Sequence, residues 1–261
     1  MKKSRILVIF AIAIMFLSGC TQIQQFSQNF VEDATVDNSI NTSYARGDFT
    51  TQGAVVYING TKFRVLETDG TIAKVLALEN IEDFRISAYA EEPEYYETED
   101  EYLMLYENSD LFNAMEDYYK SLPEELQNAI IPQENLMQTV IKEDDSNLIL
   151  SAFTQGEDFA KKKEEYQLSA AYQIEIPPVR VFALDVSDIT AYLGEGFDSK
   201  DVNKMFFETD KPVVVNIWLR STSLEEGMAY KIDGTFGQPK VESISKKASI
   251  HPAFVIDISK L

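Results

Sequence analysis

The stretch Ala54–Leu78 reads AVVYINGTKFRVLETDGTIAKVLAL and holds three short runs of apolar and β-branched residues. The runs cover residues 54–58, 62–66 and 72–78. Asn59-Gly60 and Asp69-Gly70 separate them, and such dipeptides are strong hairpin signals because tight hairpin turns favour residues that tolerate positive φ. The stretch therefore predicts a three-stranded antiparallel meander, with Ala54 as the start of the folded domain.

Residues 108–131 carry the clearest helical pattern. Apolar residues recur there at intervals of four, three and four, which places on one helix face Leu111, Met115, Tyr118 and Leu122. Asn108 or Ser109 can cap the start of this helix. The sequence Ser121-Leu122-Pro123-Glu124 has capping-box spacing and predicts a second helix that begins there and ends before Pro132.

The last third of the chain alternates apolar runs with short capped segments. Buried strands are predicted at 179–186, 213–219 and 253–258. Between them, Ser187-Asp188 and Asp198 are placed to cap two short helices. A helical surface segment is also predicted at 156–166. Together with the meander, these elements predict one α+β domain over residues 54–261, with mixed or antiparallel sheets and short helices.

The N-terminus has the order of a secretory signal. Three basic residues within the first five precede Ile6–Leu17, twelve apolar residues without a charge. A helix of that length covers about 18 Å, which is shorter than a hydrocarbon core of about 30 Å. A permanent membrane span is therefore not expected.

Leu17-Ser18-Gly19-Cys20 resembles the lipobox of bacterial lipoproteins. The resemblance implies that residues 1–19 are a signal peptide, that cleavage occurs before Cys20, and that this residue carries the lipid. It also implies attachment to the extracytoplasmic face of the cell membrane through Cys20. An ordinary signal peptide with a chance cysteine is the alternative. Residues 20–53 are polar and lack a sustained period, which predicts a flexible tether.

Composition excludes several classes of function. The chain has 43 acidic and 23 basic residues, a net charge of −20, so phosphate backbones would repel it and nucleic acid is not an expected partner. It contains one cysteine and one histidine, His251, which leaves no ligands for a zinc cluster. The acidic segment Glu91–Tyr102 lacks the turn glycine of a calcium loop and reads as a solvated loop or a docking surface for a basic partner. No metal site and no cofactor are predicted.

The order of several motifs resembles a family of uncharacterised domains on bacterial surface proteins and lipoproteins. The matching pieces are Gly60–Leu66, Asn108-Ser109, Leu122–Glu125, Val181–Asp185, Trp218-Leu219-Arg220-Ser221 and Ile250–Ala253. The resemblance implies an α+β fold of the C-type-lectin-like kind, related to the domain that matures sulfatases, and implies no function. Two residues depart from the family pattern: Phe63 replaces a tryptophan, and His251 replaces an arginine.

Four residues near the C-terminus are candidates for a ligand site. Trp218 is the only tryptophan and can serve either the core or a ligand platform. Arg220 lies two residues further along the same strand and can form either a structural salt bridge or part of a binding patch. In the second interpretation, Arg220, Ser221 and His251 converge at the ends of neighbouring strands and bind an anionic or sugar ligand.

The sequence thus favours a membrane-anchored lipoprotein whose domain binds a protein, peptide or glycan without catalysis. The first alternative is a cell-envelope enzyme that uses two carboxylates, such as a glycan hydrolase, which needs neither histidine nor cysteine. The second is a structural component of a surface complex. Two carboxyl groups about 5 to 9.5 Å apart at the base of a cleft would favour the enzyme.

Overall fold

The stretch Ala54–Leu78 forms the predicted antiparallel meander in a computed structural model of the chain. Its strands are β3 (Val55–Ile58), β4 (Thr61–Thr68) and β5 (Ile72–Ala77). Asn59, Gly60 and Gly70 all have positive φ, as the hairpin signals require. The structure describes residues 39–80, 82–85, 94–95, 102–141, 172–194, 198–225 and 227–261. These residues belong to one compact unit, Asn38–Leu261.

The folded part begins earlier than Ala54, so the predicted tether boundary at residue 53 is wrong. Strands β1 (Ser39–Asn41) and β2 (Ala45–Asp48) precede the meander, and β2 pairs with β3. Phe49 is fully buried. Gly47 has a φ of 122°, and a Cβ there would lie 3.0 Å from Val56 Cγ1. These strands are too short to show a period in sequence, and their pairing with β3 and the burial of Phe49 hold them in the fold.

The meander is one part of a larger sheet. Its strand order is β1-β2-β3-β4-β5-β17-β12, with β17 (Ala253–Asp257), β12 (Val181–Phe182) and β9 (Ile130–Ile131), which pairs with β17. All pairings in this sheet are antiparallel. The predicted strand at 253–258 is confirmed as a central strand. The predicted strand at 179–186 shrinks to two residues, because the chain enters a helix directly after Asp185.

A second sheet is mixed in direction. It has the order β11-β10-β13-β14-β15, and β16 joins β13 to β6. Its strands are β6 (Glu82–Arg85), β10 (Met137–Ile141), β11 (Tyr172–Glu175), β13 (Asn216–Ser223), β14 (Met228–Asp233), β15 (Gln238–Ser243) and β16 (Lys247–Ile250). The β10–β13 and β13–β16 pairs are parallel and the others antiparallel. The strand predicted at 213–219 corresponds to β13, which begins later, at Asn216, and ends later, at Ser223.

A two-stranded ribbon joins β7 (Glu94–Tyr95) to β8 (Tyr102–Leu103). Of the acidic segment Glu91–Tyr102, only residues 94, 95 and 102 are described, so its predicted roles stay untested. The predicted helix at 156–166 lies outside the described residues, as do the signal peptide and Cys20.

The helices form largely where capping residues predict them. They are η1 (Tyr106–Asn108), α2 (Asp110–Ser121), α3 (Glu124–Ala129), α6 (Val186–Leu193), α7 (Ser199–Phe207) and η3 (Ile258–Lys260). Ser109 caps α2 by accepting from Phe112 N–H, and Asp198 caps α7.

Two predicted caps are wrong. Ser121 Oγ donates to Tyr118 O instead of capping α3, whose N-cap is Pro123. Helix α6 is capped by Asp185, with Asp188 as the third residue of its capping box, rather than by Ser187-Asp188. Helix α3 starts at Glu124 and helix α6 at Val186, so neither serine is the N-cap. Their hydroxyl groups donate elsewhere: Ser121 Oγ to Tyr118 O, and Ser187 Oγ to Asp185 Oδ1.

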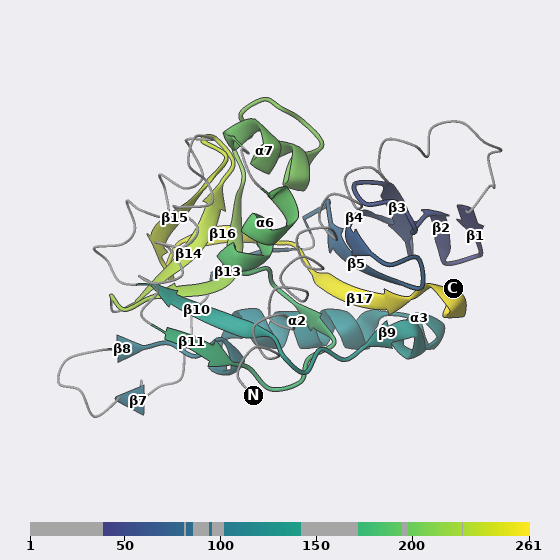
Figure 1. Cartoon of the computed structure of the whole chain (residues 1–261). Coiled ribbons are helices and arrows are strands. Elements are labelled where there is room, and N and C mark those ends of the chain that lie inside the picture. The colour runs from purple at the N-terminus through teal and green to yellow at the C-terminus, as the bar shows by residue number, and fades with distance from the viewer. Residues whose placement is uncertain are drawn as a thin grey trace, which may run out of the picture. The chain divides into compact units, whose positions relative to one another are not determined.

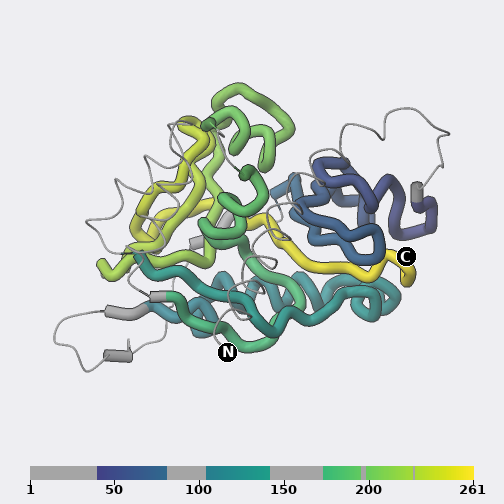
Figure 2. The backbone as a smooth tube through the Cα atoms, in the orientation of Figure 1, coloured from purple at the N-terminus to yellow at the C-terminus, as the bar shows by residue number. Residues whose placement is uncertain are grey.

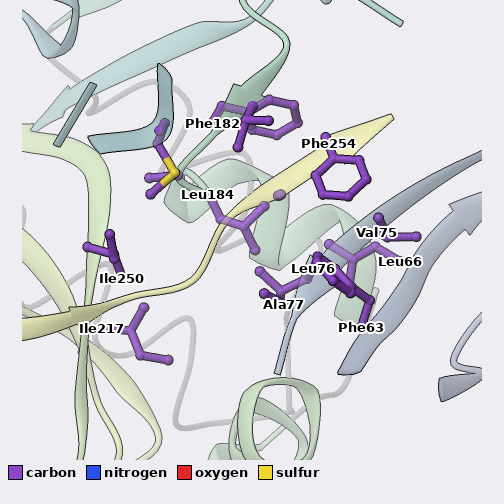
Figure 3. Close-up of a cluster of buried hydrophobic side chains, with 14 of the residues drawn as sticks. Phe63, Leu66, Val75, Leu76, Ala77, Phe182, Leu184, Ile217, Ile250 and Phe254 are labelled. Atoms are coloured by element: carbon purple, nitrogen blue, oxygen red, sulfur yellow. The ribbon is translucent and has the colours of Figure 1, made fainter. Parts of the chain in front are cut away.

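The chain passes from the second sheet to the first between β16 and β17 (Figure 1). The same path is the long yellow segment of the tube in Figure 2. Side chains of both sheets meet in one buried cluster, including Phe63 and Leu76 from the first sheet and Ile217 and Ile250 from the second (Figure 3). The fold is α+β, as predicted, with antiparallel and mixed sheets and short helices. The C-type-lectin-like relation stays a prediction.

Candidate functional site

A β-bulge in β13 brings two neighbouring residues onto the start of α6. Trp218 pairs with Lys231 and Thr222 pairs with Ala229, so residues 219–221 of β13 lie opposite Tyr230 alone. A bulge of this kind turns consecutive side chains away from strict alternation. As a result, both Arg220 and Ser221 reach the segment that leads into α6.

Arg220 is held by four interactions in the interior. Its Nε donates to Met137 O at 2.9 Å, its Nη1 donates to Ala183 O at 2.6 Å, and Nη1 lies 2.7 Å from Asp188 Oδ2. Its backbone N–H donates to Leu184 O at 3.0 Å. Burial by itself would lower the pKa of Arg220, but the negative charges of Asp188 and Asp185 raise it above its usual value. The guanidinium is therefore a fixed structural cation, as the salt-bridge interpretation predicts.

Ser221 belongs to a polar network centred on the carboxylate of Asp185. Ser221 Oγ donates to Asp185 Oδ2 at 2.6 Å and accepts from Val186 N–H at 3.0 Å. The Asp185 carboxylate also accepts from Thr139 Oγ1 at 2.7 Å and from the Ser187 N–H at 2.9 Å. Asp185, Ser221 and Thr139 are all buried. This network satisfies the first turn of α6 and ties it to β10 and β13.

The predicted patch of Trp218, Arg220, Ser221 and His251 is not assembled as one surface. Trp218 is buried in the core cluster. His251 is buried as well, with Nδ1 2.7 Å from Ala77 O and its ring edge-on to Phe206 and Phe207 of α7. Because His251 packs against α7 while Arg220 binds α6, the two residues have different neighbours.

Lys74 of β5 approaches the same helix from the other sheet. Its Nζ lies 3.7 Å from Asp188 Oδ1 and 3.6 Å from Glu67 Oε2. Both distances exceed ordinary hydrogen-bond length, so Lys74 is ion-paired but donates no hydrogen bond to any residue that the structure describes. Its side chain is 22% exposed. Its three N–H donors thus have no acceptor within hydrogen-bond length among the residues that the structure describes.

Asp188 lies between the two cations. Its Oδ2 accepts from Asp185 N–H at 2.9 Å and meets Arg220, whereas Oδ1 points to Lys74. Burial alone would raise the pKa of this carboxyl, but Arg220 and then Lys74 outweigh it, and the pKa lies below the ordinary value of 3.8. Asp188 is therefore a carboxylate at neutral pH and a poor proton donor.

Two cavities adjoin at these residues, and we call them together the Lys74 groove. The larger, of about 520 Å³, is lined by Lys74, Pro132, Gln133, Glu134, Asn135, Leu136, Met137, Ser187, Asp188 and Arg220. The smaller, of about 280 Å³, is lined by Gln52, Leu66, Glu67, Lys74, Asp188, Ala191 and Tyr192. Lys74 and Asp188 line both. Small-molecule sites span roughly 300 to 1,000 Å³, and the groove falls in that range.

Of the four residues predicted from sequence, only Arg220 lines the Lys74 groove. The sequence did not indicate that Lys74, Glu67 and Asp188 line a groove. One signal was present: Lys74 interrupts the apolar run IAKVLA, and a charged residue inside such a strand needs a partner. Its partner at position 188 could not be found from spacing, because the two residues meet only when β5 packs beside α6.

No group of three or more metal-binding side chains occurs among the described residues. None of the helices in that part of the chain is long and apolar enough to cross a membrane. The chain matches no protein-family model, no curated protein and no solved structure. The resemblance to bacterial surface domains therefore stays a prediction.

Proposed function

We propose that the protein is a lipid-anchored binding protein on the extracytoplasmic face of a bacterial membrane. The anchor rests on the sequence Leu17-Ser18-Gly19-Cys20, which follows a basic start and an apolar segment. A lipid on Cys20 would hold the domain beside the membrane, and two or more acyl chains give stable attachment. The folded domain then presents its ligand site to the cell envelope.

The observation that carries the binding role is the Lys74 groove. It combines the Lys74 ammonium group, which has no acceptor within hydrogen-bond length in the part of the chain that the structure describes, with charged neighbours on both sides and a volume suited to a small ligand or a segment of a larger one. The ligand would be a protein, a peptide or a glycan of the cell envelope.

Two carboxylates share the groove, because Asp188 Oδ1 and Glu67 Oε2 lie 3.7 and 3.6 Å from the same Lys74 Nζ, and it is the ionisation state of Asp188 that favours binding over hydrolysis. A carboxylate-dependent glycan hydrolase needs one carboxylic acid that holds its proton near neutral pH. Asp188 has a lowered pKa, and its partners Arg220 and Lys74 stabilise the charged form. Asp188 is thus suited to accepting hydrogen bonds from a ligand, and less suited to donating a proton.

The proposal can be tested with an array of envelope glycans and peptides. We would apply the full chain, purified in a detergent without a sugar headgroup, and compare the wild type with Lys74→Met and Lys246→Met. Lys246 is an exposed lysine that does not line the groove, which makes it a matched control. We expect Lys74→Met alone to lose the signal. Equal signals from all three proteins would refute the groove as the binding site.

A further inference from the structure

The chemistry of the Lys74 groove narrows the class of ligand, on the premise that the groove is the binding site. Its charges nearly balance. Lys74 and Arg220 are positive, and Asp188, Glu67 and Glu134 are negative. A ligand carboxylate or phosphate at Lys74 would lie beside Glu67 and Asp188, and a ligand ammonium at Asp188 would lie beside Lys74 and Arg220. Either charge would meet repulsion as well as attraction, so the groove offers little advantage to an ion.

The polar groups of the groove instead place a hydrogen-bond donor, Lys74, between two acceptors, Asp188 and Glu67. Lys74 Nζ supplies three donors, and the two carboxylate oxygens paired with it, Asp188 Oδ1 and Glu67 Oε2, lie 3.7 and 3.6 Å away on different residues. Neither oxygen accepts a hydrogen bond from Lys74, because both distances are too long. A hydroxyl group is both a donor and an acceptor, so it can bridge such a pair by accepting from the ammonium and donating to the carboxylate.

The orientation of Asp188 toward Lys74 is fixed by two contacts on the other carboxylate oxygen of Asp188. Asp188 Oδ2 is bound by Arg220 Nη1 and by the Asp185 N–H, which orients Oδ1 toward Lys74. The Asp188 side chain is only 11% exposed. A site with one carboxylate oxygen fixed by a buried cation and the other directed into a cavity is preorganised for a ligand donor, which reduces the entropy lost on binding.

The two halves of the groove add complementary surfaces. The larger half is lined by Gln133, whose Nε2 already donates to Ile131 O and Pro132 O, and by Asn135, whose amide can donate and accept. The smaller half contains Tyr192 and Leu66, which offer apolar surface beside the polar centre. A sugar ring has this same combination of hydroxyl edges and apolar C–H faces.

We propose that the Lys74 groove binds a neutral glycan, with neighbouring hydroxyls bridging Lys74 Nζ to Asp188 Oδ1 and to Glu67. One sugar unit occupies the larger half beside Gln133 and Asn135. The next lies across Tyr192 in the smaller half. Arg220 is a positioning residue, because it acts through Asp188.

Isothermal titration calorimetry can test this with defined probes: neutral oligomers of glucose, xylose and N-acetylglucosamine, oligogalacturonate as an anionic glycan, and a short envelope-type peptide. The full chain is used in a detergent without a sugar headgroup. We expect a neutral oligomer to bind, with an affinity that changes less than threefold between 50 and 500 mM salt. Binding of oligogalacturonate or the peptide alone would overturn the inference.

Variants separate this inference from the proposed function. Lys74→Met should weaken neutral-glycan binding by about tenfold or more, since hydrogen bonds to charged groups are among the stronger ones. Glu67→Gln, at a 76% exposed side chain, keeps the size and should also weaken binding without affecting folding. Lys246→Met should bind as the wild type does. Lys74-dependent binding of the peptide alone would keep the proposed function and refute the glycan. Binding of a glycan that neither Lys74→Met nor Glu67→Gln alters would refute the groove as the binding site, and this inference with it.

Discussion

Arg220 and Asp188 form a buried ion pair that joins β13 to the first turn of α6. Arg220 Nη1 lies 2.7 Å from Asp188 Oδ2, and the two side chains are 2% and 11% exposed. The same carboxylate faces Lys74 of β5 through its other oxygen. One helix turn is therefore bound to strands of both sheets, and the Lys74 groove lies where these three elements meet.

The first prediction concerns this pair. Arg220→Met should lower the free energy of unfolding by about 3 to 5 kcal/mol, because it removes the closer of the two cations paired with the buried Asp188 carboxylate. Adding Asp188→Asn should recover part of that loss. Urea unfolding can be followed by the fluorescence of Trp218, the only tryptophan and a buried one. The exposed pair Lys120–Asp117 is the control, and its replacement should change little. Strict additivity of the Arg220 and Asp188 substitutions would show that the pair is not coupled.

The second prediction concerns pH. The pKa of Asp188 is lower in the folded chain than its ordinary value of 3.8, so the unfolded chain binds the proton more readily. The stabilisation is present above about pH 4 and is lost as the pH falls through the folded pKa. The stability difference between the wild type and Asp188→Asn should therefore be larger at pH 7 than at pH 3. A difference that grows on acidification would contradict the sign of the shift.

The third prediction tests where the fold begins. Phe49→Ala should destabilise the protein by about 3 to 5 kcal/mol, because it removes a fully buried ring. The same substitution at Phe236, which is 58% exposed, is the matched control and should have a much smaller effect. Thermal unfolding by circular dichroism would measure both. Equal effects would argue that residues before Ala54 are not part of the core.

The fourth prediction concerns two glycines with positive φ. A Cβ at Gly237 would clash with Ser199 O, at the start of α7, whereas a Cβ at Gly60 would meet no described atom within 4 Å. Gly60→Ala should cost about 1 to 2 kcal/mol through backbone strain alone. Gly237→Ala should cost clearly more, because the strain is joined by a backbone clash. Urea midpoints for both variants would decide this, and similar losses would refute the close approach to α7.

The fifth prediction concerns the anchor. Wild-type protein expressed in a bacterial host should incorporate labelled palmitate and sediment with membranes. The Cys20→Ser variant should incorporate no label, and it should be found either released from the membrane or with its signal peptide uncleaved. The physical reason is that the thiol is the only acylation site of this kind in the sequence. Undiminished labelling of Cys20→Ser would refute the lipobox assignment.

Features that depend on neighbouring residues were predictable from sequence. The meander follows from two turn dipeptides and three apolar runs, and it formed as predicted. The caps at Ser109 and Asp198 also formed, because a cap is a contact within one helix turn. The capping box at Ser121 failed, since its serine bonds back to Tyr118 O.

The short strands β1 and β2 were not predictable in this way. They hold three and four residues, too few for a period, and pairing with β3 stabilises them. The length of the strand after Val179 was also misjudged, because the network around Asp185 starts α6 early.

By itself, the sequence determined the class of fold, the turns of the meander, the helix caps at Ser109 and Asp198, the absence of a histidine–cysteine site, and the expectation of a lipid on Cys20. The tertiary structure decided the candidate site. Lys74, Asp188 and Arg220 lie far apart in the chain and come together only through the packing of two sheets around α6. Their juxtaposition depends on long-range pairing and on one bulge in β13, and neither leaves a local pattern in the sequence.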